Sequence, residues 1–83
     1  MQLAQYVKFR EEKFGGVLFE TRSEKVYTLN PAATAVVREI QAGSNAIDIP
    51  ARLKASFRDD GGAIEREAVT FITELRQKGL VED

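Results

Sequence analysis

The chain has 83 residues, of which 43% are hydrophobic and 30% are charged, and 12 basic against 13 acidic residues give a net charge of −1. A chain of this length has room for one domain with a small core. Its balanced charge provides no general attraction to nucleic acid or to an anionic membrane. Because the sequence contains neither Cys nor His, it excludes disulfides, thiolate nucleophiles and imidazole-based metal or catalytic sites.

The chain carries no recognisable targeting or membrane segment. Its first ten residues lack the apolar stretch of about seven or more residues that a secretory signal requires. No apolar run approaches the roughly 18 residues that span a bilayer. We therefore expect a soluble, cytoplasmic protein with no membrane partner.

Residues before Asn30 have the character of short strands. Aromatic and β-branched residues in alternation predict strands over about residues 5–10, 16–20 and 25–29. Gly15 and Gly16 indicate a turn or a close approach of the backbone. Because the connections are short, the three strands are expected to form an antiparallel meander.

Residues after Asn30 have helical spacing. Asn30 is a favourable N-cap and Pro31 suits a first helical turn, so a helix is predicted over about residues 31–41. Further helices are predicted over about 48–57, with Ile49 and Leu53 on one face, and over about 63–78. Strands followed by helices indicate a single α+β domain spanning residues 1–83.

The third predicted helix has more apolar residues than one core stripe needs. At 100° per residue, the core stripe is expected to consist of Ile64, Ala68, Phe71 and Leu75. Val69 and Ile72 lie to one side of this stripe, next to Glu65 and Arg76. These two residues either line a groove or pack beneath a loop or against the edge of the sheet.

The third predicted strand is an edge of a three-stranded meander. An edge strand offers unpaired N–H and C=O groups to an extended peptide. Most edge strands have no such role and are protected by a charge, for which Lys25 is available. The pattern alone leaves both possibilities open.

No group of residues has the pattern of an active site. The neighbouring carboxylates Glu11–Glu12 and Asp59–Asp60 are expected to be solvated turn charges, because no third ligand or His accompanies them. The serines have no His partner for nucleophilic catalysis. The sequence therefore predicts a protein that is not an enzyme and that holds no cofactor or metal.

A winged-helix nucleic-acid-binding or regulatory protein is the alternative function. The second predicted helix carries Arg52, Lys54 and Arg58, which could form a local basic patch. Acidic residues cancel the basic residues of the third helix. The leading interpretation therefore has no nucleic-acid partner.

The order of these segments resembles a known family, the PqqD-like domains, also called RiPP recognition elements. The resemblance covers nearly the whole chain and rests on VKFREEKFGG at residues 7–16, VLFE at 17–20, KVYTLN at 25–30, a helix ending at Gly43, Ile49 and Leu53 in the second helix, and EREAV at 65–69 followed by Phe71, Leu75, Gly79 and Leu80. The EKFGG segment resembles the mycofactocin-type and other radical-SAM-associated members more than the PQQ-pathway protein itself.

The resemblance implies a fold and a function. The fold is winged-helix-like, with a three-stranded antiparallel sheet followed by three helices. Family members are not catalysts but peptide chaperones. They bind the leader segment of a ribosomally synthesised precursor peptide and present it to a modifying enzyme, often a radical SAM maturase.

The resemblance also implies a binding site. The leader would add a strand beside the third strand, whose backbone would supply the hydrogen bonds from Lys25, Val26, Tyr27, Thr28 and Leu29. Val69 and Ile72 would form the floor of the adjoining groove, and Glu65 and Arg76 would set its charge preference. A homodimer that uses the same edge is a further possibility.

Overall fold

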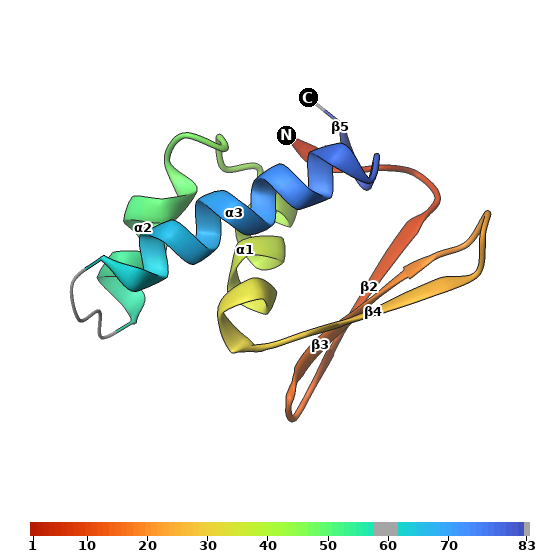
Figure 1. Cartoon of the computed structure of the whole chain (residues 1–83), viewed down its shortest axis with the longest axis horizontal. Helices are drawn as coiled ribbons and strands as arrows, with labels where there is room; N and C mark the ends of the chain where they lie inside the picture. Colours follow the sequence, from red (N-terminus) through yellow and green to blue (C-terminus); the bar gives the residue numbers. More distant parts are fainter. Residues whose placement is uncertain (58–61, 83) are drawn as a thin grey trace.

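The computed structural model describes residues 1–57 and 62–82 (Figure 1). A three-stranded antiparallel sheet in the order β2-β3-β4 is followed by three helices, which confirms the predicted α+β fold. The elements are β1 (Gln2–Leu3), β2 (Val7–Glu12), β3 (Gly15–Glu20), β4 (Lys25–Leu29), α1 (Pro31–Gln41), α2 (Ile49–Ser56), α3 (Ala63–Gln77) and β5 (Val81–Glu82).

The larger elements lie close to the expected ranges. β4 and α1 have the expected bounds, whereas β2 begins at Val7 instead of residue 5 and continues to Glu12. The chain ends also pair as β1 and β5, with Leu3 opposite Val81, and the Ala4 N–H donates to the Leu80 carbonyl at 3.0 Å. The sequence did not predict this small sheet, because two-residue strands are too short to show a period.

Glycines allow the sheet to approach α1 closely. A Cβ atom on Gly15, whose φ is 147°, would lie 2.1 Å from the Leu29 carbonyl oxygen. A Cβ atom on Gly16 would lie 2.9 Å from both the Phe9 ring and Thr34 Oγ1. The Gly15–Gly16 pair therefore marks both a turn and a close backbone approach.

Local signals set the ends of α1 and α3. The Asn30 side chain accepts a hydrogen bond from the Ala33 N–H at 2.8 Å, and Pro31 occupies the first turn of α1. Gly79, with φ of 71°, follows α3 and lets the Leu80 N–H donate back to the Leu75 carbonyl at 2.9 Å.

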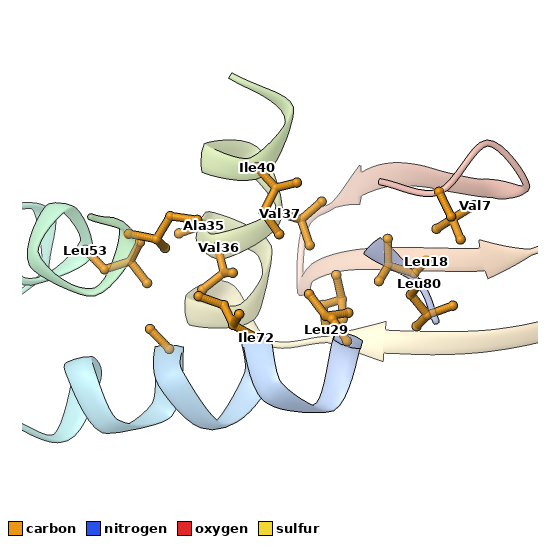
Figure 2. Packing of buried hydrophobic residues seen from close by; sticks show 14 of the residues in the cluster. Val7, Leu18, Leu29, Ala35, Val36, Val37, Ile40, Leu53, Ile72 and Leu80 are labelled. Atoms are coloured by element: carbon orange, nitrogen blue, oxygen red, sulfur yellow. The ribbon is translucent and has the colours of Figure 1, made fainter. Parts of the chain in front are cut away.

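The core lies where α1 meets both the sheet and the other two helices (Figures 1 and 2). Each large side chain removed from water there contributes about 1.5–3 kcal/mol to the free energy of unfolding before entropy is counted. The sheet and the C-terminal segment supply Val7, Leu18, Leu29 and Leu80; the helices supply Val36, Val37, Ile40, Ile49, Leu53, Ile64, Ala68, Ile72 and Leu75.

One part of the predicted core is wrong. Ile72 is only 5% exposed and belongs to the core, whereas Phe71, which was expected there, is only partly buried. Figure 2 shows Ile72 on the side of α3 that faces Val36 of α1. The core stripe of α3 is rotated from its expected position, and this helix packs against both α1 and α2.

Candidate functional site

The hydrogen-bonding direction of each strand follows from the β2–β3 hairpin. Glu12 pairs with Gly15 across a two-residue turn, so this is a hydrogen-bonded pair. Hydrogen-bonded pairs alternate with non-hydrogen-bonded pairs, which makes Lys8 and Phe19 another such pair. The bond from the Thr21 N–H to the Tyr6 carbonyl, at 2.8 Å, continues the same alternation.

The same alternation assigns the free edge of β4. Residues of β3 that do not bond to β2 bond to β4, and these include Leu18, which pairs with Tyr27. Lys25, Tyr27 and Leu29 therefore direct their backbone groups toward β3. Val26 and Thr28 direct their N–H and C=O groups away from the sheet. Within the described residues, no strand pairs with this edge of β4.

The opposite edge of the sheet, along β2, is less accessible to another strand. The Val7 N–H donates to the Ala4 carbonyl at 3.0 Å. At the other end of β2, Glu11 forms an ion pair of 2.7 Å with Arg38 of α1. The chain itself therefore uses one outward backbone donor of β2, whereas the outward groups of Val26 and Thr28 on β4 pair with no strand among the described residues.

A groove runs between β4 and α3. Its first part is a hollow of about 110 Å³ whose walls are Tyr27, Thr28 and Leu29 on one side and Phe71, Glu74 and Lys78 on the other. Leu18, Leu75 and Leu80 also line this hollow. The groove therefore has apolar surface directly beside the free edge of β4.

The groove continues past the start of α1. A second hollow, of about 420 Å³, shares Phe71 and Glu74 with the first. It is also lined by Asn30, Ala32, Ala33, Val36, Ala63, Arg66, Glu67, Ala68 and Thr70. An extended chain that leaves β4 toward its C-terminal end would enter this second hollow. Side chains of both charges lie along the α3 wall, so the groove has no single charge preference.

The loop before β4 is held by a buried carboxylate. Glu20 accepts hydrogen bonds from the Arg22 N–H at 2.7 Å, from the Ser23 N–H at 3.0 Å and from the Ser23 hydroxyl. The hydroxyl, followed by the two backbone donors, holds the pKa of Glu20 below its ordinary value despite the opposing effect of burial. The Arg22 guanidinium stacks 3.6 Å from the centre of the Tyr6 ring. These contacts fix the loop from which β4 starts.

The structure divides the predicted site residues into two groups. Lys25, Val26, Tyr27, Thr28 and Leu29 form β4, and Tyr27, Thr28 and Leu29 line the groove.

The α3 residues predicted for the groove do not lie there. Ile72 is in the core, and Glu65 forms an ion pair of 3.4 Å with Lys54 of α2. Arg76 lines a separate hollow beside Met1 and the loop before α2. Val69 is 54% exposed and lines neither hollow of the groove. In this structure the four predicted α3 residues therefore lie away from the two hollows, on the flank of α3 that is turned toward α2.

Sequence reasoning missed the α3 residues that face β4. Glu67, Phe71, Glu74 and Lys78 form a stripe at intervals of four, three and four residues, about 160° around the helix from the predicted stripe. The spacing is visible in the sequence, but the angle of 100° per residue also places Phe71 in the expected core stripe with Ile64, Ala68 and Leu75.

The basic residues of α2 do not form a free cationic patch. Arg52 forms an ion pair of 2.5 Å with Glu39 of α1, and Lys54 pairs with Glu65. The Ser44 hydroxyl, which donates to Glu39 at 2.7 Å, and then Arg52 hold the pKa of Glu39 below its ordinary value. The third basic residue of the predicted patch, Arg58, lies outside the described residues. This arrangement does not favour the nucleic-acid alternative.

The described ranges, 1–57 and 62–82, contain no cluster of three or more acidic residues arranged to hold a metal ion. Nor does any helix in them combine the length and apolar character needed to cross a bilayer. The groove beside β4 is therefore the main candidate for function, and its chemistry is that of backbone hydrogen bonding and apolar contact.

The chain is similar to proteins of known family and fold. The family model for coenzyme PQQ synthesis protein D (PqqD) matches residues 15–81. No curated protein is significantly similar in sequence. TbiB1 in complex with the TbiA(beta) leader peptide has a TM-score of 0.82 and 20% identity, covering 99% of this chain and 95% of that one. Lasso peptide synthetase B1 complexed with the leader peptide has a TM-score of 0.79 and 22% identity, covering 99% and 96%. At such identities the likeness shows a shared fold, whereas the family model covers most of the sequence: the chain belongs to the PqqD family.

Proposed function

We propose that this protein binds the leader segment of a ribosomally synthesised precursor peptide and presents the peptide to a modifying enzyme. The leader adds a strand to β4 and places side chains in the groove between β4 and α3. The protein supplies recognition and no catalytic group. Both similar structures are complexes with a leader peptide, which supports this class of ligand.

The observation that carries the proposal is the free edge of β4 beside an apolar groove. Val26 and Thr28 offer two N–H and two C=O groups in one line. Phe71 and Tyr27 line the hollow directly beside that line. Backbone hydrogen bonds supply affinity in this mode of recognition, and the hollow selects the side chain that fits. We propose Tyr27, Phe71, Glu74 and Lys78 as the side chains that contact the leader.

The binding experiment uses the precursor peptide encoded beside the gene for this protein. Its synthetic leader is titrated into the full chain by calorimetry, with a leader of scrambled sequence as the control. Because the leader must become ordered, we expect a Kd of roughly 0.1–10 µM. Equal binding of both peptides would contradict sequence-directed recognition. Binding of duplex DNA with a steep dependence on salt would support the nucleic-acid alternative instead.

The enzyme that we propose as recipient is a radical SAM maturase, in keeping with the PqqD family. The experiment immobilises the protein with its leader and measures binding of the radical SAM enzyme encoded nearby. A modifying enzyme of another class is the comparison, because one similar structure is a lasso peptide synthetase B1 complexed with the leader peptide. Capture of that other enzyme alone would overturn the radical SAM assignment and leave leader binding intact.

Self-association through β4 would use the same backbone groups as the leader. A homodimer formed in this way should dissociate when the leader is added. Sedimentation at several protein concentrations, with and without leader, tests this expectation. A dimer that persists with leader bound must use another surface.

A further inference from the structure

The outer face of the sheet, which points away from the helices, carries an apolar row that ends at the free edge. Lys8 pairs with Phe19, and Phe19 pairs with Val26, so these three residues form one row across β2, β3 and β4. Phe19 is 36% exposed and Val26 is 59% exposed. With Val17 they line a hollow of about 620 Å³ on this face. The row therefore leads to the place where a further strand would lie.

The pairing geometry determines where side chains of an added strand point. In a leader strand that adds antiparallel to β4, the residue opposite Val26 forms a hydrogen-bonded pair with it, and its side chain lies on the same outer face. The next leader residue lies opposite Tyr27, and its side chain points to the inner face, into the hollow beside Phe71. The side chains of adjacent leader residues therefore contact opposite faces of the sheet.

We infer that the leader carries two adjacent apolar residues at β4, one for the groove and one, β-branched or aromatic, for the outer row of Phe19 and Val26. This inference rests on the proposed function, because it requires strand addition at β4. It identifies Val26 as a residue that determines specificity from the face opposite the groove. The recognised segment is thus apolar on both of its faces over this short stretch.

The position and charge of the row favour the leader as its occupant. The row is continuous with the edge whose backbone groups are available. A second copy packed face to face on this surface would bring the basic residues Lys8 and Arg10 of each chain close together, although Arg10 also pairs with Glu12 at 2.5 Å. A leader strand beside β4 covers Val26 without bringing a second charged group close to Lys8, which lies on β2 at the far side of the sheet.

The test compares the same substitution on two strands of the same face. Val26→Thr removes apolar character at nearly constant volume and should weaken binding of the synthetic leader about three- to fivefold. Val17→Thr is the matched control. Val17 points to the same face but lies on β3 in the next row, between Arg10 and Thr28. Its side chain is shorter than that of Phe19 and lies roughly 10 Å from an added strand, so its substitution should leave the Kd unchanged. Equal effects, or no effect of Val26→Thr, would overturn the inference.

A peptide scan completes the test and separates it from the proposed function. Each leader residue is changed to Asn in turn, and the Kd for wild-type protein should rise most at two neighbouring positions. Sensitivity only at alternate positions would place recognition in the groove alone and overturn the inference, while strand addition would stand. Failure of the wild-type leader to bind would instead contradict the proposed function itself. A Val26→Lys variant that binds leader normally but loses the enzyme would assign the outer row to the enzyme and overturn the inference.

Discussion

The two flanks of α3 have different roles, and neighbouring residues show the difference. Ile72 is buried against α1, and Glu65 on the same flank pairs with α2. Phe71, one residue earlier, lines both hollows of the groove beside β4. The first flank has its partners within the chain, whereas the second has an apolar wall next to unpaired backbone groups.

This contrast teaches how little sequence separates a core position from a binding position. Neighbouring residues lie 100° apart and can flank the centre of a core stripe on either side, so moving that centre by roughly 25° decides which of the two is buried. Here α3 packs against both α1 and α2, and Ile72 is the neighbour that lies in the core. The two flanks should therefore respond differently to substitution, one in stability and the other in leader binding.

Ile72→Ala should have the largest effect, and it should be an effect on stability. Removing a buried Ile leaves a cavity that costs about 2–5 kcal/mol in the free energy of unfolding. Urea denaturation measures this change. Val69→Ala, on the exposed surface of the same helix, should change the free energy by less than about 0.5 kcal/mol. Similar values for both variants would contradict the assignment of Ile72 to the core.

Thr28→Pro should weaken leader binding more than about tenfold, because it removes an outward N–H and fills the edge with a ring. The fold should persist, since this N–H makes no bond to β3. Glu11→Pro makes the equivalent change on the β2 edge, because it also removes an outward N–H. The only other contact it removes is a surface ion pair with Arg38. Calorimetry with the leader distinguishes the edges: equal losses would mean that β4 is not the site.

Phe71→Ala should weaken leader binding about five- to tenfold by removing an apolar wall of the groove, while Val69→Ala should leave it unchanged. Because Phe71 is only partly buried, its substitution should affect stability less than Ile72→Ala does. Fluorescence anisotropy of a labelled leader gives both affinities. Loss of binding in the Val69 variant alone would place the binding site on the flank of α3 that contains Val69.

Acid should loosen the start of β4, with the smallest effect of the four. The pKa of Glu20 in the folded protein lies below its ordinary value of 4.5. The stabilisation that ionised Glu20 gives the folded protein is therefore complete above the pKa of Glu20 in the unfolded chain. It is lost as the pH falls through the lower pKa of Glu20 in the folded protein. Glu20→Gln should reduce the dependence of stability on pH below about 4.5. A variant whose acid unfolding curve matches that of wild type would show that Glu20 is not responsible.

The sequence contained enough information for the order of the elements but not for the rotation of α3. β4 and α1 were predictable because Asn30 and Pro31 mark the boundary between strand and helix. Phe71 and Ile72 are both apolar and both compatible with a core stripe, so only the packing of the helices against one another decides between them. The β1–β5 pair was missed because it joins segments at opposite ends of the chain.

Hydrogen exchange of the β4 amides tests the central claim most directly. In the free protein, the amides of Tyr27 and Leu29 should exchange slowly because they bond to β3, whereas those of Val26 and Thr28 should exchange quickly. Saturating leader should protect Val26 and Thr28 and leave the already slow amides little changed. Rapid exchange of both Val26 and Thr28 in the saturated complex would show that the leader does not add a strand to β4.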